Sequence, residues 1–363
     1  MRVVLLSFWF IEYTLQLANA LSKSADLLLM LPKNKTERYI QMIDDNVTSY
    51  LFHLPRNRYP SNILMLYRIV KRIRSFKPDL IHLQGGHAWF NLVLGFLSRK
   101  YTLVITVHDV THHTGDKDSL KVPSFISDLN KRYADHIIVH GNALKTQLIN
   151  AHNRAADTVC VIPHGELSVY RKLSKQKENV EQDNDTILFF GRIWEYKGLR
   201  YLIEAEPLIS KEHPNVKIVI AGSGENFEKY ERMFVNKDRF VVHNKFIPHE
   251  MVANLFQSAS IVVLPYVEAS QSGIIPLAYA FSKPVVATNV GSLAEIVDDG
   301  KTGYIVPPRD PKALAKAINS LLKDKNKLKA MGQNAYAKTK HDLSWDTIAT
   351  KTMHVYRIAI GDK

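Results

Sequence analysis

The sequence predicts an α/β protein with two domains, each built around a doubly wound parallel sheet. Short apolar runs alternate with longer amphipathic segments in both halves of the chain, and a charge-rich interval separates the halves. The length of 363 residues exceeds what one ordinary core accommodates. With 46% hydrophobic and 23% charged residues, the composition excludes a disordered or fibrous protein. We therefore expect two compact units with a cleft between them.

The first half contains apolar runs of strand length. Runs that are apolar on both faces are typical of buried parallel strands, and the helix-length segments between them supply the crossovers. After the first run, Ile11, Leu15, Ala18 and Leu21 recur at helical spacing, which favours a strand and an amphipathic helix over a secretory signal. We expect an N-terminal domain at residues 1–167. Its predicted strands lie in RVVLLSF, ADLLLML, PDLIHLQ, YTLVITVHD, DHIIVHG and TVCVIPHG.

A polar, charge-dense interval containing RKLSKQKENVEQDND then interrupts the pattern, and it predicts a linker at residues 168–185. The pattern resumes after it and predicts a second α/β domain at residues 186–343. Residues 344–363 carry apolar positions at helical spacing and predict a terminal helix that packs across the domains. The strands of the second domain are expected in TILFFGR, VKIVIAGSG, RFVVHNKFI, ASIVVLPY, KPVVATN and TGYIVPP.

The chain carries a large positive charge. Lys and Arg total 48 against 35 Asp and Glu, which gives a formal net charge of +13 and a pI near 9.5. Such a chain attracts nucleic acid, anionic membranes or phosphorylated substrates. No nucleic-acid-binding signature accompanies the charge, so nucleic acid is not an expected partner. A local basic cluster fits either a solvated helix face or a patch that faces an anionic membrane; its residues are Arg68, Lys71, Arg72, Arg74 and Lys77.

Cysteine content and hydropathy favour a cytoplasmic protein. The single cysteine, Cys160, cannot form an internal disulfide, which suits a reducing compartment. No run reaches the roughly 18 to 20 apolar residues that a membrane-spanning helix needs. Any membrane contact is therefore expected to be peripheral, on the inner membrane face.

Parallel sheets bind ligands at the carboxyl ends of their strands, so the segments after the apolar runs are where chemistry is expected. In FFGRIWEYKG, Arg192 and Lys197 lie between a predicted strand and a predicted helix. Two cations at such a loop suit a diphosphate, because Arg offers a planar fork of donors and Lys a point charge. Taken alone, the same two residues are also compatible with solvated surface charges.

The stretch VEASQSGIIPLAYAF predicts a helix that begins near Gly273. A helix start offers free backbone N–H groups, and a glycine there allows a phosphate to approach the backbone closely. Pro276 suits the first turn, where the missing N–H costs little. Glu268, before the turn, is a candidate to accept hydrogen bonds from ligand hydroxyls. An ordinary capped helix is the alternative interpretation of this stretch.

Together these motifs resemble glycosyltransferase family 4, whose members have the GT-B fold. The resemblance rests on FFGRIWEYKGLRYLIEA, VKIVIAGSGE, the long stretch from ASIVVLPYVEASQSG to PKALAKAI, and LSWDTIA, and it covers residues 186–348. The first half matches in general plan, with VHD after a strand and VIPHG before the linker. The resemblance implies two Rossmann-like domains that face a central cleft and a C-terminal helix that crosses back to the first domain.

The resemblance implies a retaining hexosyltransferase that moves a sugar from a nucleotide-diphosphate sugar to a glycan or lipid-linked acceptor, as in cell-surface polysaccharide synthesis. It places the donor mainly on the second domain and the acceptor mainly on the first. It also implies no cofactor and no metal, because fixed cations and helix dipoles offset the charge on the diphosphate. The alternatives within the same fold are a non-catalytic nucleotide-sugar-binding relative and a nucleotide-sugar epimerase or hydrolase.

The resemblance assigns roles to individual residues. The two cations would hold the donor diphosphate, the glutamate would contact sugar hydroxyls, and the histidine would lie near the transferred sugar. The expected catalytic residues are Arg192, Lys197, Glu268 and His108. The expected donor-binding residues are Gly191, Gly222, Gly224, Phe246, Ile247, Ser272, Gly273 and Ile274. The residues expected on the acceptor side are Trp9, Phe10 and Asp109.

Two positions depart from the family pattern. Many members carry a second glutamate that binds the nucleotide ribose, separated by seven residues from the first, and here that position is Pro276. Many members also have a Gly-Gly loop after the first strand, where this chain has SFWFIEY. Trp9 and Phe10 would crowd the approach of donor phosphates, so we expect them to face an acceptor or a lipid instead.

The segment HDVTHH, residues 108–113, contains three histidines and an aspartate. These residues follow a strand and do not lie on one helix face, and no acidic cluster elsewhere completes a ligand set. No metal site is therefore expected there.

Overall fold

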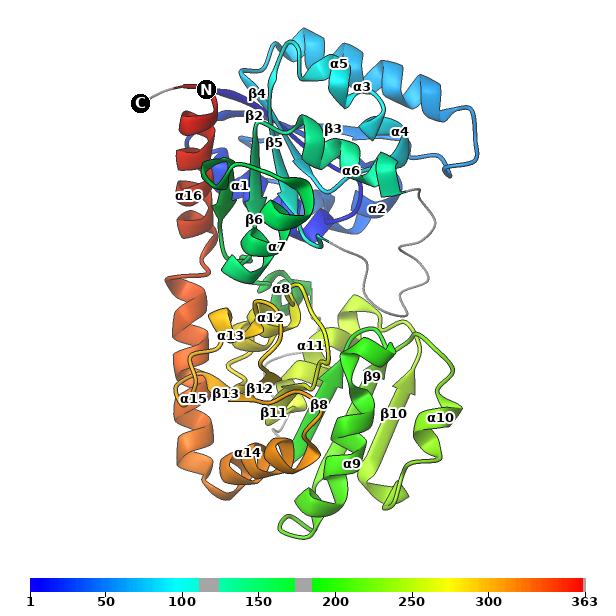
Figure 1. Ribbon diagram of the computed structural model, residues 1–363, viewed down its shortest axis with the longest axis vertical. Coiled ribbons are helices and arrows are strands. Elements are labelled where there is room, and N and C mark those ends of the chain that lie inside the picture. The colour runs from blue at the N-terminus through cyan, green and yellow to red at the C-terminus, as the bar shows by residue number, and fades with distance from the viewer. Residues whose placement is uncertain (111–123, 174–184, 362–363) are drawn as a thin grey trace. The chain divides into compact units, whose positions relative to one another are not determined.

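The structure is a computed structural model that describes residues 1–110, 124–173 and 185–361 (Figure 1). The described chain forms two compact units. The N-terminal unit contains residues 1–110, 124–165 and 345–361, and the C-terminal unit contains residues 166–173 and 185–344. Each unit is an α/β layer structure around one parallel sheet, as the sequence predicts.

The N-terminal unit is built on a seven-stranded sheet in the order β3-β2-β1-β4-β5-β6-β7. Neighbouring strands are parallel throughout. The order reverses between β1 and β4, which makes their carboxyl ends the switch point where open α/β sheets bind ligands. The strands are β1 (Arg2–Ser7), β2 (Asp26–Pro32), β3 (Thr48–Phe52), β4 (Leu80–Gln84), β5 (Thr102–Val107), β6 (His136–Val139) and β7 (Val159–Val161).

Every run predicted as a strand in the first half is a strand, but the edge strand β3 was not predicted. Its sequence TSYLF has two exposed and two half-buried residues before one buried residue. An edge strand that is wet on one side lacks the continuous apolar run by which the other strands were identified. The sheet therefore has one strand more than the sequence pattern indicates.

Helices cover both faces of this sheet. The C-terminal helix α16 (Trp345–Ala359) belongs to the N-terminal unit and packs against α1 (Ile11–Leu21) (Figure 1). This confirms the prediction of a C-terminal helix that returns to the first domain. The other helices are α2 (Lys33–Thr36), α3 (Asn62–Phe76), α4 (Ala88–Asn91), α5 (Leu94–Leu97), α6 (Ser124–Tyr133) and α7 (Asn142–His152), with 3-10 turns η1 (Glu37–Met42) and η3 (Ala156–Thr158).

The C-terminal unit is built on a six-stranded parallel sheet in the order β10-β9-β8-β11-β12-β13. All of its strands were predicted. Here the order reverses between β8 and β11, so their carboxyl ends form the second switch point. The strands are β8 (Thr186–Phe190), β9 (Lys217–Gly222), β10 (Phe240–Asn244), β11 (Ile261–Leu264), β12 (Val285–Thr288) and β13 (Gly303–Val306).

Two hydrophobic clusters form the core of this unit, one on each face of the sheet. The central strand β8 contributes Ile187 and Phe189 to one cluster and Leu188 to the other, as the alternation of side chains along a strand requires. The helices are α8 (Val169–Leu173), α9 (Leu199–Ser210), α10 (Glu228–Glu231), α11 (His249–Ser258), α12 (Ile274–Ala280), α13 (Leu293–Ile296), α14 (Pro311–Lys323) and α15 (Lys325–Lys340), with 3-10 turns η4 (Glu195–Lys197) and η5 (Lys237–Arg239). None of the described helices is long and apolar enough to cross a membrane.

Candidate functional site

The predicted residues of the C-terminal unit lie at the carboxyl ends of neighbouring strands. Gly191 and Arg192 follow β8, and Glu268 follows β11, the strand beside β8 where the strand order reverses. Residues after β9 and β10 flank them on one side. The sheet therefore brings segments that are far apart in sequence to the edge where ligands bind in open α/β sheets.

A pocket of about 180 Å³ opens at the ends of β8, β9 and β10. Phe246 borders it with 73% of its surface exposed, so this ring is available to a ligand and is not part of the core. An exposed aromatic ring beside a mainly apolar pocket suits the planar face of a base. The pocket is lined by Phe190, Gly191, Arg192, Ala221, Gly222, Ser223, Lys245, Phe246 and Ile247.

Two glycines allow the loop after β8 to pair with the loop after β9. A Cβ atom on Gly222 would lie 1.7 Å from the carbonyl oxygen of Gly191, and one on Gly224 would lie 2.0 Å from that of Ile193. Gly222 also has a φ of 152°, which favours glycine. Only Gly222 of this pair lines the pocket. The close pairing fixes the backbone on which Arg192 is carried.

Arg192 and Lys197 lie against two tyrosines of the same region. Arg192 Nη2 donates to the hydroxyl of Tyr196 over 3.1 Å. Lys197 Nζ lies 3.7 Å from the ring centroid of Tyr266, within cation–π range. Burial raises the pKa of Tyr266 to about 12, so the ring beneath the ammonium group stays a neutral phenol. Both cations are thus held at one edge of the sheet, Arg192 exposed and Lys197 half-buried.

The loop that carries Lys197 is held against the segment after β11. Gly198 has a φ of 66°, and a Cβ atom there would lie 1.9 Å from the carbonyl oxygen of Pro265. The backbone N–H of Val267 donates to the carbonyl of Tyr196 over 2.8 Å. These contacts place the two cations and the half-buried Glu268 in adjoining loops.

Helix α12 begins at Ile274 with Gly273 as its N-cap, which confirms the predicted helix start. Pro276 is the third helical residue and is buried, in the first turn as predicted. The hydroxyl of Ser272, which is 4% exposed, accepts the N–H of Ile274 over 3.3 Å. One of the amides expected to meet a phosphate therefore already has an acceptor within the chain.

In the N-terminal unit, Phe10 covers His108. The two ring centroids are 3.7 Å apart with 20° between the planes, and His108 is 4% exposed. Gly85, with a φ of 73°, makes room for the aromatic ring, because a Cβ atom there would lie 2.9 Å from it. The bulky loop after β1 is thus accommodated by a glycine after β4.

Both ring nitrogens of His108 have partners within the unit. Nδ1 is 3.2 Å from His140 Nε2, and Nε2 is 3.3 Å from the side-chain oxygen Oε1 of Gln84. Burial, followed by repulsion from other histidines, holds the pKa of His108 well below its usual range, so the ring is neutral at pH 7.

Three histidines follow neighbouring strands in the same way. His108 follows β5, His140 follows β6 and His164 follows β7. The sequence signal that could have identified this histidine group is the recurrence of a histidine after a strand in VHD, IVHG and IPHG.

Trp9 and Asp109 differ from Phe10 in being exposed. Trp9 is 53% exposed, and Lys35 Nζ lies 3.3 Å from its ring centroid while donating to the carbonyl of Phe8 over 3.2 Å. Desolvation lowers the pKa of Lys35 to about 8. The residues predicted for the acceptor side are therefore divided: Trp9 and Asp109 face outward, and Phe10 packs on His108.

Within residues 1–110, 124–173 and 185–361, no group of three or more His, Cys, Asp or Glu side chains is arranged to hold a metal ion. His112 and His113 of the HDVTHH segment lie outside the described residues, as do residues 174–184 of the predicted linker.

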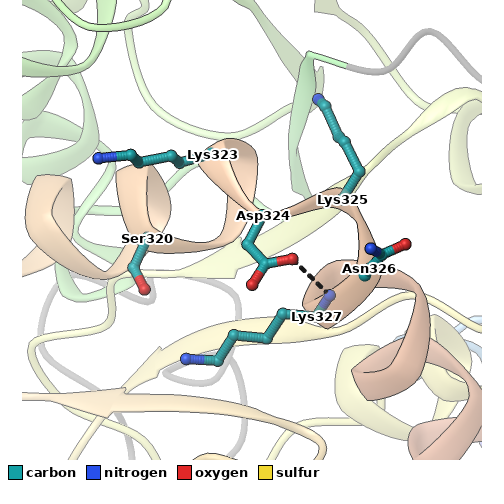
Figure 2. A pocket seen from close by; sticks show the side chains of 6 residues that line it. All are labelled: Ser320, Lys323, Asp324, Lys325, Asn326 and Lys327. Atoms are coloured by element: carbon teal, nitrogen blue, oxygen red, sulfur yellow. Dashed lines mark hydrogen bonds between the residues drawn. The ribbon is translucent and has the colours of Figure 1, made fainter.

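A larger hollow of about 630 Å³ lies where α14 meets α15, away from the strand ends. Figure 2 shows the side chain of Lys325 directed away from those of Lys323 and Lys327. Lys325 pairs with Asp185 over 2.6 Å, and Asp324 caps α15 by accepting the N–H of Lys327 over 2.9 Å. The lysines do not converge on a common point, so this hollow is ordinary helix surface.

Comparison with known proteins supports one assignment for both units. The family model "Glycosyl transferases group 1" matches residues 171–338, and the model "Glycosyltransferase Family 4" matches residues 12–165. An uncharacterized glycosyltransferase of Methanocaldococcus jannaschii is 34% identical over 62% of this chain, and the alignment spans 60% of that relative. The D-inositol 3-phosphate glycosyltransferase of Paenarthrobacter aurescens is 28% identical over 85% of this chain and 80% of its own.

Solved structures show the same architecture. HepE of Anabaena, crystallised in complex with UDP, matches with a TM-score of 0.71 and 20% identity over 99% of this chain and 100% of HepE. At this identity the likeness shows the fold alone. With the two Rossmann-like sheets and the returning C-terminal helix, it identifies the GT-B fold.

Proposed function

The chain belongs to glycosyltransferase family 4, and we propose that it is a retaining enzyme that transfers a hexosyl group from a nucleotide-diphosphate sugar to a glycan or lipid-linked acceptor in cell-surface polysaccharide synthesis. The observation that carries the proposal is the gathering of Arg192, Lys197 and Glu268 at the β8–β11 switch point, beside a pocket with an exposed aromatic ring. The UDP complex of HepE and the glycosyltransferase relatives support a nucleotide donor.

The donor occupies the C-terminal unit in this proposal. The base lies in the pocket beside Phe246 and Ile247, and the diphosphate meets Arg192 and Lys197. As the glycosidic bond breaks, negative charge grows on the departing diphosphate, and the two cations stabilise it without a divalent metal. The loop before α12 offers backbone N–H groups to the distal phosphate, and Glu268 accepts from sugar hydroxyls.

The acceptor occupies the N-terminal unit, with Trp9 and Asp109 as exposed contacts. His108 serves as a neutral hydrogen-bonding group, because its ring is buried and its pKa is lowered. Contact between His108 and the transferred sugar requires Phe10 to move aside, since this ring covers the imidazole. Phe10 is thus a cover for the acceptor side of the site.

The proposal is tested by a donor screen that follows nucleotide-diphosphate release with and without candidate acceptors. Replacing Arg192 and Lys197 by Ala, singly and together, removes charge stabilisation of the leaving group, and we expect turnover to fall roughly 100-fold or more. Arg200→Ala is the matched control, because Arg200 is an exposed arginine paired with Glu204 on α9. Unchanged turnover in the double variant contradicts the assigned roles.

The same screen separates the alternatives. Release that needs no acceptor indicates a hydrolase, and conversion of the donor to another nucleotide sugar indicates an epimerase. Donor binding by calorimetry with no transfer or release over a broad panel indicates a non-catalytic relative.

The proposal of a lipid-linked acceptor is supported by exposed side chains on α3 and on the segment α4–α5, which form one surface. Ile63 and Tyr67 on α3 are 62% and 63% exposed, and Phe96 on α5 is 55% exposed. Arg74 lies 5.2 Å from the ring of Phe96, which joins the two helical segments into one surface. Apolar side chains at this exposure, next to cations, suit a bilayer interface better than bulk water.

The charged residues of this surface are all basic. Residues 46–78 and 80–108 contain no Asp or Glu, while α3 alone carries Arg68, Lys71, Arg72 and Arg74. Each basic residue near an anionic bilayer contributes about 1 kcal/mol to binding. We infer that this surface contacts the inner, anionic face of a membrane, so that a cytoplasmic enzyme meets its lipid-linked acceptor there.

Vesicle co-sedimentation tests the membrane contact. Vesicles of phosphatidylcholine with phosphatidylglycerol should bind the protein, and vesicles of phosphatidylcholine alone should bind it weakly. Lys71→Glu with Arg74→Glu should reduce binding by roughly tenfold or more. Lys211→Glu with Lys316→Glu in the C-terminal unit is the charge-matched control. Equal binding by both double variants contradicts the assigned surface.

A further inference from the structure

A chain of buried side chains joins His108 to the C-terminal helix. His140 Nε2 is 3.2 Å from His108 Nδ1. On the other side of the ring, Gln84 Oε1 is 3.3 Å from His108 Nε2, and Gln84 Nε2 is 3.2 Å from His82 Nε2. His82 Nδ1 is 2.6 Å from the hydroxyl of Tyr356 on α16. All five side chains are at most 4% exposed, so water does not substitute for these partners.

The backbone carbonyl of Ile162 determines which nitrogen of each ring in this series of side chains is protonated. His140 Nδ1 is 2.9 Å from the carbonyl oxygen of Ile162, which can only accept. Burial lowers the pKa of His140 to about 4, so its neutral ring has one proton, and that proton is on Nδ1. His140 Nε2 is then an acceptor, and His108 must donate to it from Nδ1. The neutral ring of His108 is left with an unprotonated Nε2.

The remaining groups complete the pattern in one way. Because His108 Nε2 can only accept, Gln84 must turn its NH₂ group toward it and its carbonyl oxygen toward His82, an orientation that the similar shapes of the two amide ends permit. His82 then donates from Nε2 toward Gln84 and toward Thr106 Oγ1 at 2.8 Å. Its Nδ1 accepts the hydroxyl proton of Tyr356. Each of the three ring N–H groups then faces an acceptor.

Other groups pack around His108 and His140 without changing these hydrogen-bond directions. The rings of Tyr13 on α1 and His164 after β7 pack against those of His108 and His140, with centroids 5.2 to 6.3 Å apart. The carboxylate of Asp109 acts on His140 by raising its pKa, a smaller effect than burial. His164 Nδ1 donates to the carbonyl oxygen of Gly165 over 2.7 Å, and no hydrogen bond joins it to His108 among the described residues.

We propose that His140 is a positioning residue that holds His108 in the tautomer with the proton on Nδ1, so that His108 presents an unprotonated Nε2 to which, among the described residues, Gln84 donates. The inference rests on the proposed function in giving this tautomer a role in sugar transfer. The geometry points to a donor hydroxyl or acceptor hydroxyl as the group that would replace the Gln84 NH₂ at Nε2 during the reaction.

The tautomer is measured directly by ¹⁵N NMR of the full chain labelled at histidine, since protonated and unprotonated ring nitrogens resonate in separate regions. His108 is identified by its loss in His108→Gln. At pH 7 the unmodified protein should show protonated Nδ1 and unprotonated Nε2 at His108, with a roughly tenfold or greater preference. The opposite tautomer in the unmodified protein overturns the inference without any further variant.

Substitution then tests the coupling. His140→Phe removes the acceptor and should shift His108 toward a mixture of tautomers, whereas His140→Asn, which keeps an acceptor, should retain the Nδ1–H form in part. His164→Phe is the matched control, because it alters a buried histidine of the same group that does not bond to His108. A tautomer at His108 that responds equally to His140→Phe and His164→Phe contradicts a specific role for His140.

Kinetics separates this inference from the proposed function. In His140→Phe, kcat should fall roughly tenfold or more while donor KM changes little, because the base and the diphosphate of the donor bind the other unit. If the tautomer is as stated but no donor is turned over by the unmodified protein, the proposed function fails and the tautomer assignment stands. If turnover is present but His140→Phe leaves kcat unchanged, the positioning role fails.

Discussion

Phe10 lies almost parallel to the ring of His108, with 3.7 Å between the centroids. The contact exists because Gly85 leaves space behind Phe10, so three residues from three strand ends define it. It accounts for the low exposure of a histidine that lies at a ligand-binding edge, and it makes the loop after β1 a determinant of access to His108.

Removing the Phe10 ring that covers His108 should change both the free energy of unfolding and the pKa of His108. In Phe10→Ala we expect a loss of about 1 to 3 kcal/mol, less than for a fully buried phenylalanine because Phe10 is half-buried. Water gains access to His108, so its pKa should rise toward the ordinary value. Urea unfolding and NMR titration check the two effects. Phe125→Ala, at a 67% exposed position, is the control and should change neither quantity.

Gly222 should be intolerant of any side chain. A Cβ atom there meets the Gly191 carbonyl at 1.7 Å, and both partners are backbone, so the loops after β8 and β9 must separate. We expect Gly222→Ala to destabilise the C-terminal unit by about 3 kcal/mol or more and to weaken donor binding. Gly300→Ala, at a φ of 75° with open space around it, should cost only about 1 kcal/mol. Similar losses in the two variants contradict the packing argument.

Acid should unfold the N-terminal unit before the C-terminal unit. Burial lowers the pKa of His82 and His164 to about 3 and that of His140 to about 4, each from 6.5 in the unfolded chain. The unfolded state therefore binds more protons than the native state between these values. Stability is fully present above pH 6.5 and falls as the pH drops below it.

The slope of this pH dependence can be predicted. Each of the three histidines removes about 1.4 kcal/mol of stability per pH unit below 6.5. Urea unfolding at intervals between pH 7.5 and 5 measures it, and His164→Gln should reduce the slope by about 1.4 kcal/mol per pH unit. Stability that is flat across this range shows that the histidines are not buried in neutral form.

Restoring the family glutamate tests the ribose contact. Pro276 is buried in the first turn of α12, so Pro276→Glu should lower the stability of the unliganded protein by about 1 to 3 kcal/mol. With donor present, a carboxylate that reaches the ribose gains a hydrogen bond, and donor KM should fall by up to about tenfold. Initial rates measured over a range of donor concentrations, with Pro276→Gln as the uncharged comparison, test this. A donor KM unchanged by the glutamate places the ribose away from α12.

The sheets were predictable from the sequence because most strands are buried on both faces and read as continuous apolar runs. The edge strand β3 was missed because its first two residues are exposed. The cation loop and the α12 start were found because Gly, Arg, Lys and Pro mark strand-to-helix turns by their backbone and charge properties. These features are local, so they are visible without knowledge of the fold.

The histidine group was not predictable in the same way. His82, His108 and His140 lie on or after strands that adjoin only because of the strand order β4-β5-β6. The contact of Phe10 with Gly85 likewise requires β1 and β4 to be neighbours although 77 positions separate paired residues such as Val3 and Leu80. Such contacts depend on topology, which apolar patterns alone do not determine.

The return of α16 to the N-terminal unit has a consequence for synthesis of the chain. Tyr356 supplies the hydroxyl that satisfies buried His82, and Trp345 packs against Tyr13. Until residues 345–356 leave the ribosome, the first unit to be translated lacks part of its core. The C-terminal unit, whose described residues end at 344, is complete before then, so the order in which the two units finish folding is the reverse of the order in which they begin to be made.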